Sequence, residues 1–391
     1  MSKALNHQAS LGSYYEFFAG GGMARAGLGE SWACLFSNDF DHKKAHSYAK
    51  NWGAEHLKVG DVRAINTHDL PSNADLAWAS FPCQDLSLAG GGAGLKGDRS
   101  GTFWPFWQLM SDLGGENRQP NVIALENVCG TLTSHGGKDF TAICEAFRTA
   151  GYRFGAVVMD AALFVPHSRP RLFVVGVHRS VDIDDKLVSN VSSAIWHTKS
   201  VRTAYERLPD ELKADWVWWH LPTPAPRKSR FSDLIEDNPT SVDWHTESDT
   251  QRLMSMMSRV NLDKVEMAKK TGRRMVGTLY KRTRRDSYGN KVQRAEVRFD
   301  DIAGCLRTPS GGSSRQLIMV VDGDEVKTRL ISTRETARLM GLPEDYVLPQ
   351  KYNEAYHLTG DGVVVPVVRH LAQHILEPLV TQTKQMARSA A

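Results

Sequence analysis

Short apolar runs alternate with helical patterns throughout residues 1–178, and this alternation restricts the chain to a small set of folds. Strands that alternate with helices form a mostly parallel sheet with helices on both faces. We therefore expect an α/β fold of that kind. The expected strands are Tyr14–Phe18, Ala33–Ser37, Ala74–Ser80, Val122–Leu125, Phe154–Met159 and Leu172–Val177, and the expected helices are Asp41–Asn51, Asp139–Ala150, Thr333–Met340 and Val364–Leu379.

The alternation stops near residue 180, where prolines, a tryptophan cluster and a basic stretch follow. The tryptophans Trp216, Trp218 and Trp219 favour core packing over a stacking platform. From Lys269 to Arg298 there are eleven Lys or Arg and two acids, which fits a solvated face or a nucleic-acid footprint. We expect a smaller, mixed and largely irregular lobe here, which divides the chain into residues 1–180, 181–349 and a C-terminal helical segment, 350–391.

Cysteine usage and hydropathy bear on the compartment. The five cysteines form no CxxC pair, which argues against a disulfide framework and a structural zinc site. The first ten residues hold no apolar signal segment, and no apolar run is long enough to span a bilayer. The sequence predicts a cytoplasmic protein with no membrane segment and no metal.

Each polar or glycine-rich segment of the first lobe stands at the end of an expected strand or, for Gly60–Asp61, of a weaker apolar segment. Ligands of open parallel sheets bind at the carboxyl ends of the strands, so these segments are expected to meet along one edge. They are Ala19–Gly22, Asn38–Asp39, Gly60–Asp61, Phe81–Gln84 and Glu126–Val128.

The glycines at 20–22 allow close backbone approach to a ligand, and Asp39 follows Gly22 by 17 residues, a distance that suits a ribose diol. Arg25 stands where a dinucleotide fingerprint has its third glycine, which disfavours an NAD-dependent enzyme. A plain tight turn explains the glycines equally well.

Cys83 follows an apolar run and a proline, and a glycine-rich stretch follows it. A thiolate held at a strand end is a nucleophile, although many buried cysteines are simply small apolar residues. Glu126 by itself could cap the next helix. The order of the whole set of motifs is what distinguishes these alternatives.

In that order the motifs resemble those of the cytosine-5 DNA methyltransferases, in the arrangement typical of bacterial modification enzymes. The resemblance covers most of the first lobe and the C-terminal segment. It departs from the usual pattern at Met23, at Phe40 in place of Trp, at His167 in place of Gln, and at Asp361-Gly362. The matching segments are Phe17–Gly22, Ser37–Asp41, Gly60–Val62, Phe81–Gln84 with Ser87, Arg99–Thr102, Glu126–Val128, His167–Arg171, Arg334–Pro343 and Gly360–Val364.

The resemblance implies a Rossmann-like fold, S-adenosylmethionine as cofactor and a covalent mechanism. Cys83 would add to carbon 6 of a cytosine flipped out of the duplex, Glu126 would contact ring nitrogen 3, and Arg171 and Arg169 would bind and support the ring carbonyl. The implied cofactor-binding residues are Phe18, Gly20, Gly22, Asp39, Phe40, Asp61, Val62, Pro82, Asp361 and Val363.

For the second lobe the resemblance implies a target recognition domain that binds double-stranded DNA. The glycine-rich residues 84–97 would form a hinged lid. A monomer is expected, with a cognate restriction endonuclease in the same host. The implied DNA-binding residues are Gln84, Ser87, Arg282, Arg284, Arg285, Arg307, Thr308, Gly311 and Gly312.

Two alternatives remain open at this stage. An RNA cytosine-5 methyltransferase shares the motifs, but the long segment between Arg171 and Arg334 favours duplex DNA. A catalytically silent DNA-binding relative would keep the fold, but Cys83, Glu126 and Arg171 are all present.

Overall fold

The computed structural model describes residues 10–82, 95, 100–286, 288–306 and 314–390. The chain forms two compact units. The first comprises Met1–Asp160, Pro170–Pro224 and Val365–Ala391, and the second comprises Ala161–Arg169 and Ala225–Val364. The ranges expected from the sequence differ from these units at residues 181–224, which belong to the first unit, and at residues 161–169 and 350–364, which belong to the second.

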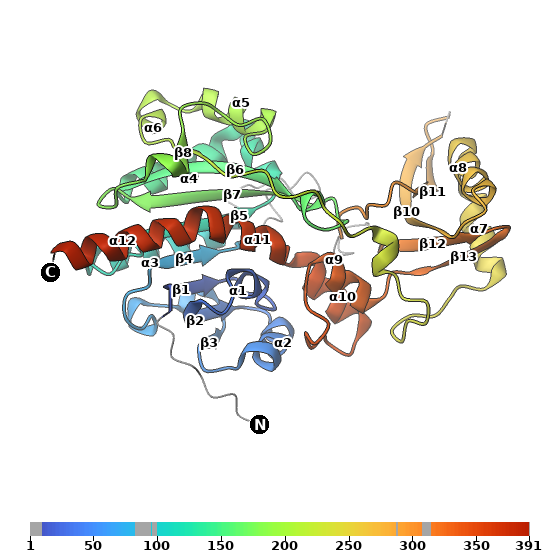
Figure 1. Cartoon of the computed structure of the whole chain (residues 1–391), viewed down its shortest axis with the longest axis horizontal. Coiled ribbons are helices and arrows are strands. Elements are labelled where there is room, and N and C mark those ends of the chain that lie inside the picture. Colours follow the sequence, from blue (N-terminus) through green and yellow to red (C-terminus); the bar gives the residue numbers. More distant parts are fainter. Residues whose placement is uncertain (1–9, 83–94, 96–99, 287, 307–313, 391) are drawn as a thin grey trace. The chain divides into compact units, whose positions relative to one another are not determined.

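The first unit is built on a seven-stranded sheet with the order β3-β2-β1-β4-β5-β7-β6 among the described residues (Figure 1). The strands from β3 to β5 run parallel, whereas β7 is antiparallel to both β5 and β6. This mostly parallel sheet confirms the fold class expected from the sequence. The strands are β1 (Gly12–Phe17), β2 (Trp32–Asp39), β3 (Leu57–Val59), β4 (Leu76–Ala79), β5 (Val122–Asn127), β6 (Tyr152–Asp160) and β7 (Pro170–His178).

Apolar side chains of β1, β4 and β5 form a core with the helices α3, α4 and α5. Trp216 and Trp218 pack against this core and Trp219 is fully buried, so the tryptophan cluster belongs to the packing of the first unit. The helices of this unit are α1 (Met23–Leu28), α2 (His42–Trp52), α3 (Phe103–Gly115), α4 (Lys138–Thr149), α5 (Lys199–Arg207), α6 (Asp210–Lys213), α11 (Val365–Leu371) and α12 (Glu377–Ala390), and the short strands β8 (Val188–Ser189) and β9 (Trp218–Trp219) pair separately.

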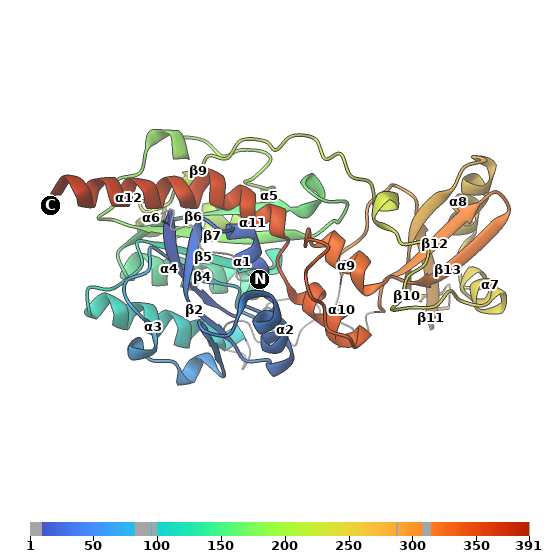
Figure 2. The same cartoon turned by 60° about the horizontal axis from the view of Figure 1, so that its bottom comes forward.

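The last helices of the chain return to its first elements. The helix α11 packs against α1, and α12 contacts β1 (Figure 2). Gly27 permits this packing, because a β-carbon there would lie 2.4 Å from the Cβ atom of Val368. By length and composition the helical stretch Tyr352–Met386 could cross a membrane, but 61% of its most apolar window is buried, as in a core helix.

The second unit contains an antiparallel sheet with the order β11-β10-β12-β13. Residues of α7 and α8 join one face of this sheet in a separate apolar core that includes Leu253, Val265, Leu279 and Val297. The elements are α7 (Glu247–Ser255), α8 (Arg259–Lys270), β10 (Met275–Arg285), β11 (Lys291–Arg298), β12 (Leu317–Asp322), β13 (Glu325–Leu330), α9 (Thr333–Leu339) and α10 (Tyr352–Asp361).

Candidate active site

The carboxyl ends of five neighbouring parallel strands meet at one edge of the first unit's sheet. Each strand brings one of the polar or glycine-rich segments expected from the sequence. Parallel sheets bind ligands at this edge, because the loops that leave the strands there can diverge and enclose a cavity. Ala19–Gly22 follow β1, Asn38 and Asp39 end β2, Gly60 and Asp61 follow β3, Phe81 and Pro82 follow β4, and Glu126 and Asn127 end β5.

The turn after β1 requires its glycines. Gly20 and Gly22 have φ angles of 57° and 77°, which side chains with a β-carbon adopt only with strain. A β-carbon on Gly22 would also lie 2.3 Å from Nε1 of Trp52. That indole nitrogen donates a 3.0 Å hydrogen bond to the carbonyl of Gly21. The turn is therefore held from α2, an interaction that the sequence pattern did not reveal.

Asp39 joins the end of β2 to this turn. Its Oδ2 atom accepts a 2.7 Å hydrogen bond from the Gly20 amide, and its Oδ1 atom accepts one of 2.8 Å from the Asp41 amide. Burial raises the pKa of the Asp39 carboxyl, and the nearby Lys44 opposes that shift. Phe40, the next residue, is 71% exposed. The Asp39 carboxylate, whose oxygens can each accept a further hydrogen bond, is therefore followed directly by the exposed ring of Phe40.

The other cofactor residues expected from the sequence occupy different environments. Phe18 follows β1 with a φ of 59° and packs against the core. Asp61 accepts a 2.9 Å hydrogen bond from the Arg63 amide and begins a short 3-10 turn, in which Val62 is buried. Pro82 is half-buried after β4. Asp361 and Val363 belong to the second unit.

A buried carboxyl group lies on β1, immediately before the glycine turn. Glu16 is fully buried, and its Oε2 atom accepts a 3.5 Å hydrogen bond from Ser37, which in turn lies 2.6 Å from the hydroxyl of Tyr48. Arg25 donates to that hydroxyl at 2.9 Å. Burial raises the pKa of Glu16 to about 8, although Arg25 opposes the shift. Glu16 is therefore protonated at neutral pH.

We expect the stability of the protein to fall as pH rises from about 4.5 to about 8, because the folded state retains a proton on Glu16 that the unfolded chain releases. Glu16→Gln replaces the carboxyl group with an amide that does not titrate, so the two states no longer differ in proton binding at this position. In urea unfolding, the variant should gain a few kcal/mol relative to the wild type across that pH window. Glu30→Gln controls for the loss of one exposed acid. A difference between the Glu16 variant and the wild type that does not change with pH would contradict a protonated Glu16.

Glu126 and Arg171 form an ion pair at the same edge of the sheet. The Nε atom of Arg171 lies 3.2 Å from Oε1 of Glu126, and the two side chains are 15% and 9% exposed. The pair depends on the antiparallel direction of β7, because the strand begins where β5 ends. A parallel β7 would have placed Arg171 at the opposite edge.

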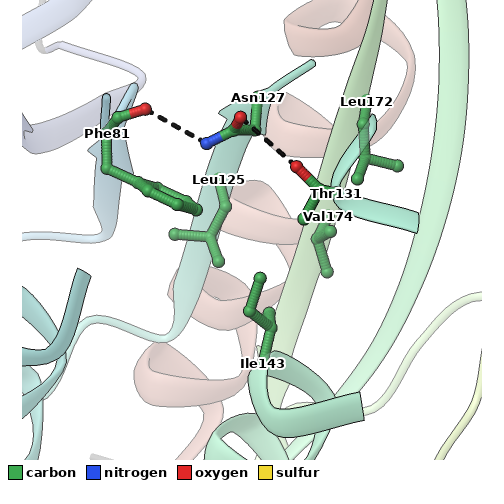
Figure 3. Close-up of a pocket in the computed structure, with 7 residues that line it drawn as sticks. All are labelled: Phe81, Leu125, Asn127, Thr131, Ile143, Leu172 and Val174. Atoms are coloured by element: carbon green, nitrogen blue, oxygen red, sulfur yellow. Dashed lines mark hydrogen bonds between the residues drawn. The ribbon is translucent and has the colours of Figure 1, made fainter. Parts of the chain in front are cut away.

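Asn127 links the end of β5 to the end of β4 (Figure 3). Its Nδ2 atom donates a 3.1 Å hydrogen bond to the carbonyl of Phe81, and its Oδ1 atom accepts one of 3.3 Å from Thr131. These three residues, together with apolar side chains of β5, β7 and α4, line a cavity of about 10 Å³. Asn127 thus fixes the segment that leads into Cys83, although Cys83, Gln84 and Ser87 lie outside the described residues. Among the described cysteines, Cys34 and Cys144 are buried and Cys129 and Cys305 are partly exposed.

Arg169 belongs to the second unit, in which it joins two distant segments. Its Nη1 atom donates to the carbonyl of Leu306 at 3.2 Å, and its Nη2 atom donates to the carbonyls of Gly360 and Gly362 at 2.8 Å each. The side chain is almost completely buried. His167 lies nearby in sequence and accepts a 3.2 Å hydrogen bond from the Leu306 amide. The supporting catalytic role expected for Arg169 stays a prediction.

The basic stretch forms the antiparallel hairpin β10–β11 of the second unit. Arg282, Arg284 and Arg285 are exposed near the end of β10. The other residues expected to bind DNA, Arg307, Thr308, Gly311 and Gly312, lie outside the described residues. Within the described residues, no group of His, Cys, Asp and Glu side chains gathers as a metal site.

Comparison with known proteins identifies relatives along nearly the whole chain. The profile of a family described as C-5 cytosine-specific DNA methylase matches residues 13–377. The type II methyltransferase M.BsuFI of Bacillus subtilis is 27% identical over 380 residues, which cover 96% of this chain and 75% of that protein. M1.ScrFI of Lactococcus lactis subsp. cremoris is 25% identical over 382 residues, which cover 97% of this chain and 82% of that protein.

Solved structures of similar fold include the Dnmt2 methyltransferase of S. pombe, with a TM-score of 0.59 and 17% identity. That match covers 94% of this chain and 99% of the other. The methyltransferase EhMeth of Entamoeba histolytica gives a TM-score of 0.62 with 14% identity and covers 94% and 98% of the two chains. At these identities the structural likeness shows the fold.

Proposed function

Since the chain belongs to the C-5 cytosine-specific DNA methylase family, we propose that it recognises a specific sequence in duplex DNA and methylates a flipped-out cytosine there through a covalent adduct with Cys83. The chain is a DNA cytosine-5 methyltransferase with S-adenosylmethionine as methyl donor. The flipped base, the covalent adduct and the role of each residue are the proposed part. Flipping costs a few kcal/mol of stacking and pairing.

The residues at the edge of the sheet suit S-adenosylmethionine. Gly20 has a positive φ and no atom within 4 Å of a β-carbon position, so a ligand can approach its backbone. The exposed ring of Phe40 offers a stacking face beside Asp39, whose carboxylate can hold ribose hydroxyls. When bound, the cofactor supplies an electrophilic methyl group. Phe18, Gly22, Asp61, Val62 and Pro82 from the first unit, with Asp361 and Val363 from the second, complete the proposed set.

The protein's own part in the reaction begins with Cys83. Its thiolate adds to carbon 6 of cytosine, which makes carbon 5 nucleophilic enough to take the methyl group. Glu126 contacts ring nitrogen 3 and the exocyclic amine and stabilises the charge that develops during the addition. Arg171 binds the ring carbonyl oxygen, and Arg169 supports that site. Loss of the proton from carbon 5 then expels the Cys83 thiolate and releases the product.

One observation carries this assignment beyond the family match: the Glu126–Arg171 pair adjoins the segment that leads into Cys83. Asn127, next to Glu126, holds the carbonyl of Phe81, two residues before Cys83. The acid, the cation and the segment that leads into the proposed nucleophile are thus joined by an ion pair, a hydrogen bond and two adjacent residues of β5. Such an arrangement supports catalysis because it preorganises the reacting groups.

The second unit is proposed to recognise the target sequence. Its residues Arg282, Arg284 and Arg285 would contact phosphates, and Arg307, Thr308, Gly311 and Gly312 would lie near the bases, with Gln84 and Ser87 contributed by the lid. Type II relatives suggest a cognate restriction endonuclease in the same host. We also propose a monomer that acts in the cytoplasm.

Methyl transfer to different nucleic acids tests the proposal. The purified protein is incubated with labelled S-adenosylmethionine and either duplex DNA or tRNA. We expect label in DNA only, and bisulfite sequencing of DNA from an expressing host should place the methyl group in one sequence context. Label in tRNA alone would indicate an RNA methyltransferase. Binding to DNA without any incorporation would indicate a silent relative.

A further inference from the structure

The basic residues of the hairpin β10–β11 lie on two opposite faces. Register pairs Arg282 with Arg294 and Tyr280 with Glu296, and side chains along a strand alternate between the faces. The even-numbered residues of the outer hairpin therefore share one face, which we call the even face: Tyr280, Arg282, Arg284, Val292, Arg294 and Glu296. The opposite face carries Leu279, Ala295 and Val297 in the core beside α8 and continues outward to Arg285 and Lys291.

Positive charge exceeds negative charge on the even face. Arg282 and Arg294 stand directly opposite each other, and like charges in that position repel. Glu296 forms ion pairs with both Arg282 and Arg284. Its Oε2 atom lies 3.5 Å from Nε of Arg282, and its Oε1 atom lies 2.6 Å from Nε of Arg284. Among the residues named for this face, Glu296 is thus the one carboxylate beside three guanidinium groups, and Asp286 in the adjoining turn adds a second negative charge near Arg294. An anion that bound there would relieve the repulsion.

The same face is connected to the chain on either side of residues 307–313. The hydroxyl of Tyr280 accepts a hydrogen bond from the Gly304 amide and donates a 2.9 Å hydrogen bond to Oε1 of Gln316. Gly304 is required for this contact, because a β-carbon there would lie 2.2 Å from the Tyr280 oxygen. Ser314 donates a further 3.0 Å hydrogen bond to the carbonyl of Lys281. The strand that carries Arg282 therefore also holds the residues that flank the proposed base-reading segment.

We propose that the even face binds the phosphates of duplex DNA and that Glu296 is an internal counter-ion that phosphate displaces. This inference rests on the proposed DNA methyltransferase function. Arg294 thus replaces Arg285 among the phosphate contacts proposed above, because the Arg285 side chain belongs to the other face of the hairpin. Exposed ion pairs are weak, so a phosphate with two or more arginine partners can replace the Glu296 carboxylate.

Salt dependence of DNA binding tests the choice of face. The full chain binds a fluorescent duplex at a series of salt concentrations. Arg294→Gln should reduce the slope of log affinity against log salt by roughly 0.9, the value for one lost phosphate contact. Lys291→Gln removes the same charge from the other face of the same hairpin and should leave the slope unchanged. An equal reduction in both variants, or none with Arg294→Gln, would overturn the assignment.

Glu296→Gln tests the internal counter-ion. Freed from the carboxylate, the arginines should bind DNA roughly threefold more tightly or better, with a slope steeper by up to about 0.9. Glu325→Gln is the matched control, since it removes an exposed acid from β13 of the same sheet. Equal affinity gains in the two variants would rule out a special role for Glu296.

The proposed function is tested separately by the wild-type protein. If the wild type transfers methyl groups to duplex DNA but the Arg294 and Lys291 variants behave alike, only the even face is refuted. If the wild type neither binds nor methylates DNA, the proposed function fails together with the inference. Thermal melting of each variant, which should match the wild type, shows that a change in binding does not arise from unfolding.

Discussion

Cys83→Ser is expected to abolish methyl transfer, with a loss of at least on the order of 10³-fold in rate. A free thiol with a pKa of about 8.5 is a few per cent thiolate at pH 7, whereas a serine hydroxyl is almost never ionised there. Binding of S-adenosylmethionine and of DNA should persist, because neither requires the thiolate. Labelled methyl incorporation measures the loss, and calorimetry measures the retained affinity for the cofactor.

Cys129→Ser is the matched control, since Cys129 follows Glu126 by three residues. Burial raises the pKa of that thiol, although Arg171 opposes the shift, so it is poorly suited to act as a nucleophile. DNA with 5-fluorocytosine at the target should trap the wild type and Cys129→Ser as covalent complexes, but not Cys83→Ser, because the fluorine blocks the final elimination. Turnover by Cys83→Ser near the wild-type level would remove Cys83 from the mechanism.

Arg329→Met is expected to lower the free energy of unfolding by about 3–5 kcal/mol. Arg329 and Glu335 are both fully buried and form a two-pronged pair, with Nη1–Oε2 and Nη2–Oε1 distances of 2.8 and 2.6 Å. The guanidinium also lies over the ring of Trp244 and donates to the carbonyl of Glu236. Its loss would leave a buried carboxylate without its cation. Urea unfolding measures the change.

Two further variants separate charge from volume. Lys327→Met breaks an exposed ion pair on the same strand and should change stability by no more than about 1 kcal/mol. Adding Glu335→Gln to Arg329→Met removes the uncompensated charge and should recover a large part of the loss. If the double variant is as unstable as Arg329→Met alone, the ion pair is not the source of the effect.

The sequence was sufficient to predict the parallel strands β1, β2, β4 and β5. Each of these is an apolar run followed by a glycine or polar residue, and such runs predict both the strand and the edge at which ligands bind. The parallel strand β3 was not among the expected strands, because its three residues, Leu57–Val59, include a lysine and form no apolar run. The direction and place of β7 could not be predicted. Its central residues, from Leu172 to Val177, are buried and carry no polar side chain, and that pattern is the same for either direction of the strand.

Hydrogen bonds between residues distant in sequence account for what remained unpredicted at the site. Nothing near Gly21 indicates that Trp52 would bond to its carbonyl, and nothing near Phe81 indicates Asn127. Arg169 and Arg171 lie in the same sequence motif, yet the Arg169 guanidinium donates hydrogen bonds to the carbonyls of Leu306 and Gly360. Which basic residues share a face of the hairpin β10–β11 depends on the register between the two strands. The positions of the charged residues in the sequence do not reveal that register.

The return of the last helices to the first elements has a consequence for how the protein is made. The surface of α1 that Val368 covers is synthesised more than 300 residues before Val368. At about 5–20 residues per second, a ribosome needs on the order of tens of seconds to cross that interval. The α1 surface of a nascent chain therefore stays uncovered while residues 225–364 of the second unit are translated. A chain whose synthesis ended before α11 would contain every residue of the second unit but would lack the helices that contact α1 and β1 in the first.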